Sequence, residues 1–246
     1  MLKQSSYDKG VSLIVFGKDN NLQFLRTLNE ISLVFKKLGD ISFEIVLVDD
    51  GSATRKYQDE LRNRSIKIIN LPKSVGISGA VLEGVKNSKF NFILPIPGHD
   101  MFSAQGIQNV VSLLGYSQIV IGIRSNIVQE RPLIKRIASR LSLRLFQNLI
   151  SNSISDIHGL ILYKKQDLIK YLNYNDGHGI SVRMLANIVR ANGLIIQTIS
   201  PIKDGHKKHK AKKYPSFKNV LKVLLIILQE TKVIRRKTNQ GKWSNK

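Results

Sequence analysis

The chain has 246 residues, of which 42% are hydrophobic, and this composition excludes a wholly disordered protein. Its 39 Lys and Arg residues against 17 Asp and Glu give a formal net charge of +22, which favours phosphate esters, nucleic acid or an anionic membrane surface as partners. The absence of Cys excludes disulfides, thiolate catalysis and Cys-ligated zinc.

Strand and helix patterns alternate over roughly the first half of the chain. Residues 11–16 and 43–48 are apolar and rich in β-branched side chains, as in strands buried on both faces of a parallel sheet, and the segment between them has apolar residues at helical spacing. The other predicted elements in this part are strands at 66–69, 90–96 and 119–123 and helices at about 76–87 and 103–114. This alternation predicts an α/β protein with a doubly wound sheet, whose ligands lie outside the carboxyl ends of the strands.

The pattern is looser beyond residue 125. A helix over 132–150 has one apolar stripe and one stripe that holds Arg136, Arg140 and Arg144, so we expect it to be amphipathic and basic. The other predicted elements are strands at 159–163 and 194–199, a helix at 182–192 and a terminal amphipathic helix at 217–228. No segment reaches the ~20 apolar residues that span a bilayer.

Two neighbouring carboxylates follow the predicted strand 43–48. Asp49 and Asp50 begin the run Asp-Asp-Gly-Ser, so they emerge at the sheet edge where a ligand would bind. One of them could accept hydrogen bonds from a base or a ribose. The alternative is a turn and helix cap, because turns and caps prefer these residue types.

The strand 90–96 is followed by Gly98, His99 and Asp100. An acid at this place could hold a divalent cation through oxygen, with diphosphate oxygens and water as the other ligands, and His99 would suit manganese better than magnesium. The alternative for Asp100 is an ordinary helix cap.

A small-residue turn follows the strand 66–69. Asn70, Gly76 and Gly79 belong to it, and such a turn lets the backbone approach a ligand and present N–H groups to an anion. Close packing of a helix on the sheet is the alternative explanation. Neither a P-loop nor a Rossmann glycine motif is present.

The order of these motifs resembles the family-2 glycosyltransferases with the GT-A fold. This resemblance implies a Rossmann-like doubly wound sheet that is mixed and mostly parallel. Within them it is most similar to the dolichyl-phosphate mannose synthase-like branch, which includes bacterial enzymes of polyprenyl-phosphate and surface-polysaccharide assembly. The resemblance implies a UDP- or GDP-sugar donor bound across the strand ends. The residues it assigns to the donor are Gly17, Lys18, Asp19, Asp49, Asp50, Asn70, Gly76, Gly79, Gly98 and His99.

The resemblance also assigns the metal and the acceptor side. Asp100 would coordinate Mg²⁺ or Mn²⁺ on the diphosphate, although Gly98 stands where the first acid of the Asp-x-Asp motif belongs. Asp156 is the candidate acid or base toward a sugar-hydroxyl acceptor, whereas a lipid-phosphate acceptor needs no general base; an ordinary loop aspartate is the alternative. The candidate phosphate or acceptor contacts are Arg124, His158, His209 and Lys210.

The predicted organisation is a glycosyltransferase domain over 1–202 and a basic tail with an amphipathic helix over 203–246. Within the domain, the nucleotide-binding half covers about 10–125 and the acceptor half about 126–202. The tail holds 14 Lys or Arg beside two acids, so we expect it to bind anionic lipid. The polar N-terminus lacks the apolar stretch of a secretion signal, and the expected location is cytoplasmic, peripheral at the inner face of the cell membrane.

The expected function is inverting transfer of a sugar from a nucleotide-diphosphate sugar to a polyprenyl phosphate or a growing surface glycan. A nucleic-acid-binding protein is the main alternative, because the charge would bind polyanions by counterion release. Only 7% of the residues are aromatic and no known motif appears, so we expect no nucleic acid. A nucleotidyltransferase and a non-catalytic relative are further alternatives, and a homo-oligomer is left open.

Overall fold

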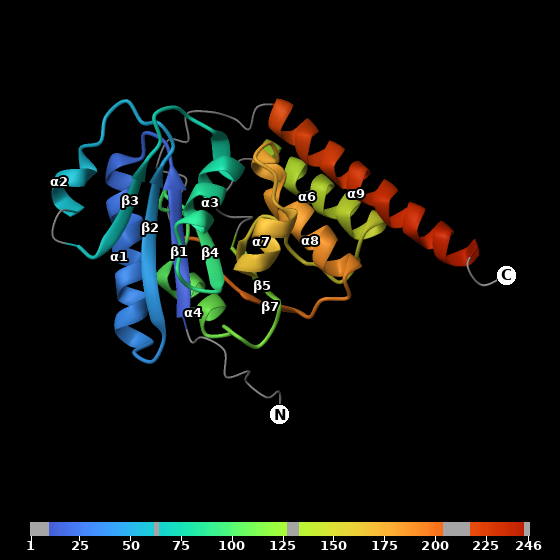
Figure 1. The fold of residues 1–246 in the computed structure, drawn as a ribbon, viewed down its shortest axis with the longest axis horizontal. Coiled ribbons are helices and arrows are strands. Elements are labelled where there is room, and N and C mark those ends of the chain that lie inside the picture. The colour runs from blue at the N-terminus through green and yellow to red at the C-terminus, as the bar shows by residue number, and fades with distance from the viewer. Residues whose placement is uncertain (1–9, 62–63, 127–132, 204–216, 244–246) are drawn as a thin grey trace.

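The computed structural model describes residues 10–61, 64–126, 133–203 and 217–243, which build one seven-stranded sheet covered by helices on both faces (Figure 1). The strands are β1 (Gly10–Gly17), β2 (Ser42–Asp49), β3 (Ile66–Asn70), β4 (Phe92–Pro97), β5 (Ile119–Ile123), β6 (Leu160–Lys164) and β7 (Ile195–Ile199). The helices are α1 (Asn21–Lys37), α2 (Tyr57–Leu61), α3 (Gly76–Lys86), α4 (Ala104–Val111), α6 (Leu133–Leu149), α7 (Lys165–Tyr171), α8 (Ile180–Arg190) and α9 (Phe217–Trp243), with a short 3₁₀ helix η1 (Gly177–Gly179).

The sheet is mixed and mostly parallel, which confirms the predicted fold class. Its order is β3-β2-β1-β4-β6-β5-β7, with only β6 antiparallel to its neighbours. Because β6 alone is reversed, the carboxyl ends of the other six strands and the amino end of β6 share one edge of the sheet. We call this edge the strand-end edge.

Alternate strand residues enter two separate cores. Val11, Leu13 and Val15 of β1 pack with α1 and α4, whereas Ile14 and Phe16 pack with the core that contains α3 and α8. Side chains of a strand point alternately to its two faces, and both faces here are buried, so residues 13–16 of β1 form a continuous apolar run. The predicted strands were recognisable for this reason.

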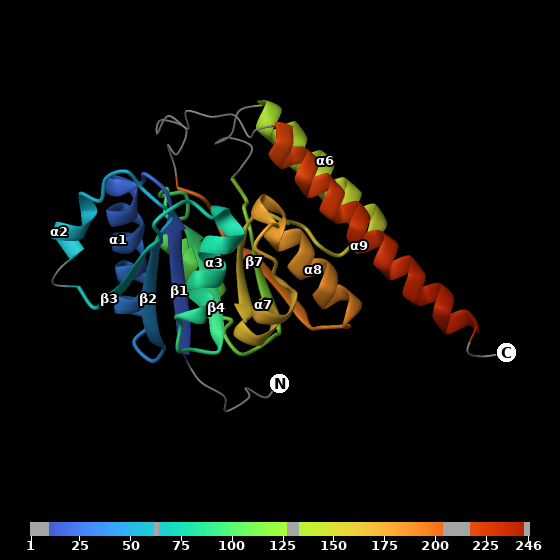
Figure 2. The same cartoon turned by 45° about the horizontal axis from the view of Figure 1, so that its top comes forward.

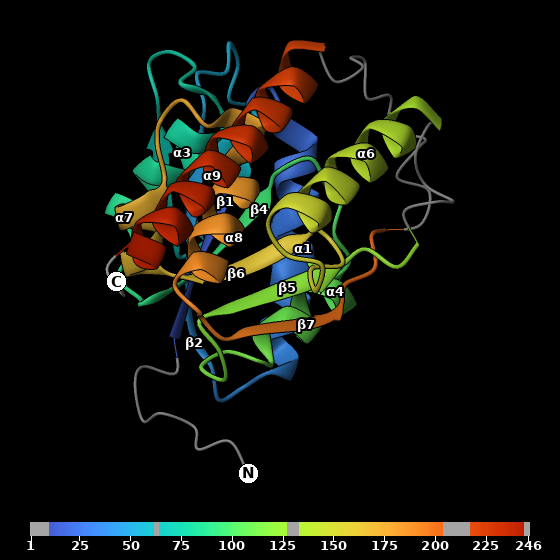
Figure 3. The same ribbon diagram turned by 90° about the vertical axis from the view of Figure 1, so that its right-hand side faces the viewer.

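Helices α6 and α9 lie side by side and form an outer layer beyond α8 (Figure 2 and Figure 3). Glu230 of α9 is buried and forms ion pairs with Arg183 and Arg190 of α8, and Arg183 also contacts Asp176. Helix α9 extends to Trp243, well beyond the predicted end at residue 228. Within the described residues, none of the helices combines the length and the apolar character that a membrane span requires.

Two short helices were not predicted. Helix α2 has five residues and α7 has seven, too few for a clear helical period. Helix α7 also begins at Lys165, directly after the last residue of β6, so no turn residue marks its start.

Candidate functional site

The predicted site residues of the two halves share the strand-end edge. Gly17, Asp49 and Asn70 stand in register at the ends of β1, β2 and β3, and Phe16 is in register with Pro97 of β4. Arg124 follows the last residue of β5, and Asp156 lies four residues before β6 begins. The ends of five parallel strands and the segment before the antiparallel β6 therefore meet at the same edge.

The loop after β1 is joined to the loop after β2. The backbone N–H of Asp19 donates to Oγ of Ser52 (2.8 Å), and Oδ1 of Asp19 accepts from the N–H of Ala53 (3.1 Å). Asp19 has a φ of 54°, a left-handed conformation that Asp tolerates better than most residues. Lys18 and Asp19 are exposed at the edge, so both are accessible to a ligand there.

Asp49 is fully buried and both of its carboxylate oxygens have protein partners. Oδ1 accepts from the N–H of Ser52 (2.8 Å), and Oδ2 accepts from the hydroxyl of Tyr57 (2.7 Å). Burial, followed by the hydrogen bond to Asp49, raises the pKa of Tyr57, which keeps its hydroxyl a donor. Asp49 thus fastens the turn after β2 to α2, and its contact with a donor stays a prediction. Sequence reasoning missed Tyr57.

Asp50 holds the entrance of α3. Its Oδ1 accepts from the N–H of Val75 (2.7 Å), and its Oδ2 accepts from the hydroxyl of Ser74 (2.7 Å) and the N–H of Gly76 (3.1 Å). Gly76 has a φ of +80°, which favours glycine. The N–H of Gly76, which was considered for anion binding, therefore binds Asp50 together with the N–H of Val75. The contact of Asp50 with a base or ribose stays a prediction.

The two remaining donor candidates of this region differ in setting. A Cβ at Gly79 would lie 2.7 Å from Cγ2 of Val75, so close packing explains this glycine. Asn70 is exposed, and its Oδ1 accepts from Nε2 of Gln58 (3.0 Å).

Gly98 leaves room for the ring of Phe24. A Cβ at Gly98 would lie 2.2 Å from Cε1 of Phe24, whose side chain is fully buried. The first acid of an Asp-x-Asp motif therefore cannot stand here unless the ring moves. His99 is exposed at the end of β4.

Asp100 is buried among charged partners from distant parts of the chain. Its Oδ1 accepts from Nζ of Lys203 (2.8 Å), and the same ammonium lies 2.9 Å from Oε1 of Glu30. The backbone N–H of Asp100 donates to Oγ1 of Thr27 (3.1 Å). Burial by itself lowers the pKa of Lys203, but the hydrogen bonds to Asp100 and Glu30 and their charges outweigh it, so the pKa is raised. Lys203 and Glu30 carry no local sequence signal, because they lie 103 and 70 residues from Asp100.

The residues around Asp100 do not fit a divalent metal ion. Only 3% of Asp100 is exposed, and Mg²⁺ usually keeps several water ligands. At a metal–oxygen distance of about 2.1 Å, an ion on Oδ1 would lie within roughly 5 Å of the Lys203 ammonium. In the described part of the chain, no group of three or more His, Cys, Asp or Glu could hold a metal. Mg²⁺ or Mn²⁺ on Asp100 is therefore not supported.

Arg124 and Asp156 form a buried bidentate ion pair. Nε of Arg124 donates to Oδ2 of Asp156 and Nη2 to Oδ1, both at 2.7 Å, and the N–H of His158 also donates to Oδ1 (2.8 Å). Burial raises the pKa of Asp156, but the charge and hydrogen bonds of Arg124 outweigh it, so the pKa is lowered. This setting suits a carboxylate that positions Arg124 better than it suits a general base.

One nitrogen of Arg124 has no hydrogen-bond partner among the described residues. Its Nη1 is buried without one there, while Nε and Nη2 are held by Asp156. A buried guanidinium N–H without an acceptor costs free energy unless a ligand or water supplies one. Of the other predicted acceptor contacts, His158 is partly exposed, and His209 and Lys210 lie outside the described residues.

Several solved structures have the same fold as this chain. A mycobacterial protein matches with a TM-score of 0.65 and 13% identity over 90% of this chain and 74% of that one. Mannosyl-3-phosphoglycerate synthase from Rubrobacter xylanophilus matches with a TM-score of 0.64 and 10% identity. The match covers 94% of this chain and 75% of that one. Residues 1–349 of S. aureus TarS in complex with UDP-GlcNAc match with a TM-score of 0.58 and 16% identity. This match covers 90% of this chain and 66% of that one. At these identities the matches establish the GT-A fold.

The family follows from the sequence itself. Residues 25–172, more than half of the chain, match the family described as Glycosyl transferase family 2. This span contains β2 to β6 and the residues from Asp49 to Asp156 that meet at the strand-end edge. Together with the fold, this match shows that the chain belongs to glycosyl transferase family 2.

Proposed function

We propose that the chain transfers a sugar, with inversion, from a nucleotide-diphosphate sugar to a polyprenyl phosphate. Family membership and the gathering of β1, β2 and β4 loop residues at the strand-end edge support the donor. The S. aureus TarS structure contains UDP-GlcNAc, and we expect a UDP- or GDP-sugar across the same edge here. Asp19 and Lys18, exposed on the loop after β1, are the proposed contacts with the nucleotide.

The assignment of the acceptor rests on Nη1 of Arg124, which has no hydrogen-bond partner in the part of the chain that the structure describes. Asp156 fixes the guanidinium plane through two hydrogen bonds, so Nη1 faces away from Asp156 as a pre-oriented donor. A phosphate oxygen is a suitable acceptor for such a donor. Because Nη1 is buried, the side chains that cover it must move slightly before a phosphate oxygen can reach it.

A phosphate acceptor also agrees with the state of Asp156. A polyprenyl phosphate is ionised near pH 7, so one of its oxygens can attack the anomeric carbon without losing a proton first. The new bond forms between that oxygen and the carbon, the bond from the carbon to the diphosphate breaks, and the nucleoside diphosphate leaves. A sugar-hydroxyl acceptor would need a base, and the hydrogen bonds of Asp156 to Arg124 and His158 oppose that role.

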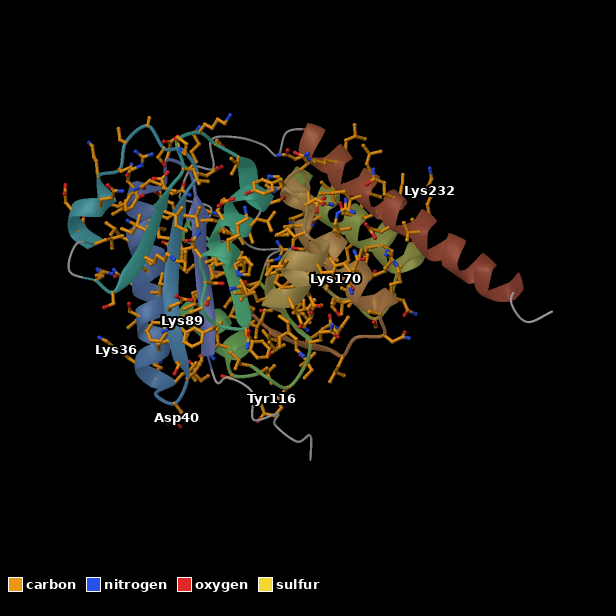
Figure 4. The ribbon with its side chains drawn as sticks, in the orientation of Figure 1. Lys36, Asp40, Lys89, Tyr116, Lys170 and Lys232 are labelled. Carbon is orange, nitrogen blue, oxygen red and sulfur yellow. The ribbon has the colours of Figure 1, made fainter. Side chains whose placement is uncertain are left out.

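Helices α6 and α9 support an action at an anionic membrane surface. Both carry apolar side chains that are about half exposed, namely Ile137, Leu141, Leu221, Leu225 and Leu228. Exposed Arg140 and Arg144 lie on α6 beside them, and Lys232 projects from α9 away from the body of the protein (Figure 4). Apolar and basic side chains on one helical layer are typical of interfacial binding.

The exposed lysines are not arranged as in a nucleic-acid-binding surface. Exposed lysines are spread over the molecule: Lys36 and Lys89 lie near the edge opposite the strand-end edge, and Lys170 lies on α7 (Figure 4). They form no single stripe that tracks a polyanion backbone.

The acceptor is tested by measuring nucleoside diphosphate release with polyprenyl phosphate and a panel of UDP- and GDP-sugars. We expect release to require both substrates, and Arg124→Met to lower kcat/KM by about 100-fold or more. Arg64→Met, which removes an exposed arginine bonded to Asn29, is the matched control and should have wild-type activity. Transfer to a glycan hydroxyl but not to polyprenyl phosphate would refute the acceptor assignment.

The membrane contact is tested by flotation with phosphatidylglycerol vesicles. Leu221→Ser together with Leu225→Ser should reduce flotation at least fivefold, because the apolar part of the contact is lost. Both leucines are exposed and neither belongs to the core, so the circular dichroism spectrum of the variant should match that of the wild type. Equal flotation of the variant and the wild type would exclude this face of α9 as the membrane contact.

A further inference from the structure

We propose that Lys203 is the resident cation of the Asp100 carboxylate and takes the place of a divalent metal ion there. Its Nζ lies 2.8 Å from Oδ1 of Asp100 and 2.9 Å from Oε1 of Glu30. One ammonium thus bridges two carboxylates, as a bound cation would. This inference concerns the cation at Asp100 and goes beyond the proposed function.

The backbone around Lys203 is held in place. Its N–H donates to the carbonyl of Met101 (2.8 Å). The N–H of the preceding Ile202 donates to Oδ1 of Asn126 (2.9 Å), and the carbonyl of Ile202 accepts from Nδ2 of Asn126 (2.8 Å). Phe102 and Ile202 form an antiparallel bridge between the same two segments. The ammonium is therefore delivered from a fixed position, which lowers the entropy lost on pairing with Asp100.

The second carboxylate has a further positive partner. Oε2 of Glu30 accepts from the N–H of Ala104 (2.7 Å), the first residue of α4. A helix N-terminus carries roughly half a positive charge, so the ammonium and α4 together balance most of the charge of Glu30 and Asp100. A divalent ion on Oδ1 of Asp100 would compete with Lys203 for the same oxygen.

The assignment changes the role of Asp100. Its carboxylate fastens the segment 200–203 to the loop after β4, and Asp100 is then a positioning residue. If the proposed function holds, the charge that grows on the leaving diphosphate is neutralised without a metal on Asp100. The assignment of the cation itself does not depend on the reaction.

The test is a titration of the purified full chain with Mn²⁺ alone, with free Mn²⁺ measured by electron paramagnetic resonance. Wild type and Asp100→Asn should bind Mn²⁺ equally, and Asn keeps the left-handed backbone at this position (φ 57° in the structure). Lys203→Met should gain one Mn²⁺ site at least tenfold tighter than any in the wild type, and adding Asp100→Asn should remove it. Lys203→Arg keeps the charge and should behave as the wild type.

Two results would overturn the proposal. The first is a wild-type Mn²⁺ site that Asp100→Asn abolishes, and the second is a folded Lys203→Met that gains no site. If Lys203→Met does not fold by circular dichroism, the comparison of the wild type with Asp100→Asn decides alone: equal binding supports the proposal and loss of a site refutes it. Failure of the proposed function would instead appear as no shift in Tm with UDP or GDP.

Discussion

Replacing Gly98 with Ala places a methyl group where the ring of Phe24 now lies. The added Cβ would lie 2.2 Å from Cε1 and 2.3 Å from Cδ1 of Phe24, and 3.2 Å from the carbonyl oxygen of Phe16. Phe24 is fully buried and packs edge-to-face on Tyr57, with 5.2 Å between ring centroids. The ring cannot move without disturbing Tyr57, whose hydroxyl holds Asp49.

The expected cost follows from this overlap. Extra methyl groups in a packed core typically cost about 1–3 kcal/mol, and we expect about 2 kcal/mol for Gly98→Ala. For a chain of this size, that corresponds to a fall in Tm of about 4–8 °C. Gly98→Asp should cost more, because it also brings a carboxylate into the apolar cluster around Phe24.

Urea unfolding followed by circular dichroism measures the effect. Gly39→Ala is the matched control, because a Cβ at Gly39 meets no atom within 4 Å, and it should change the free energy of unfolding by less than about 0.5 kcal/mol. Phe24→Leu should relieve the strain, so a double-mutant cycle of Gly98→Ala with Phe24→Leu should show a favourable coupling of about 1 kcal/mol. Gly98→Ala with wild-type stability, or additive effects in the cycle, would refute the reasoning.

The remaining predictions concern buried ion pairs. Asp156→Asn should lower the free energy of unfolding at pH 7 by about 3 kcal/mol, because Arg124 stays buried without its counter-charge. The folded-state pKa of Asp156 is lowered, so its stabilisation is present above the unfolded pKa of about 3.9 and is lost as the pH falls through the folded value. The difference between variant and wild type in urea unfolding should therefore narrow below about pH 4, and a constant difference would contradict this account. Glu230→Ala should leave Arg183 and Arg190 without the carboxylate of α9, and trypsin should cleave α9 faster, whereas equal cleavage rates would show that the pairs do not hold the helix.

Much of the fold could be predicted from the sequence because the signal is local. Strands buried on both faces appear as short apolar runs such as 43–48, and helices covering a sheet show apolar residues at three- and four-residue spacing. The doubly wound class and the edge that carries the site follow from this alternation. Short helices such as α2 and α7, and the far end of α9, did not follow, since they lack a clear period.

The residue types at the strand ends were also visible in the sequence, but their contacts were not. Asp49, Asp50, Asp100 and Asp156 all lie at the predicted edge, and each carboxylate binds a partner within the protein. The partners lie on other elements: Lys203 is 103 residues from Asp100, and Arg124 is 32 residues from Asp156.

The sequence by itself determined which segments become strands, that those of the first half are parallel, and at which edge their ends meet. Only the tertiary structure decided which charges are paired, that Phe24 fills the space beside Gly98, and that Nη1 of Arg124 has no partner within residues 10–61, 64–126, 133–203 and 217–243. The physical reason is the separation in sequence over which each signal acts. The periodicity of side chains is set by neighbouring residues, whereas a carboxylate pairs with any cation that the folded chain brings within about 3 Å.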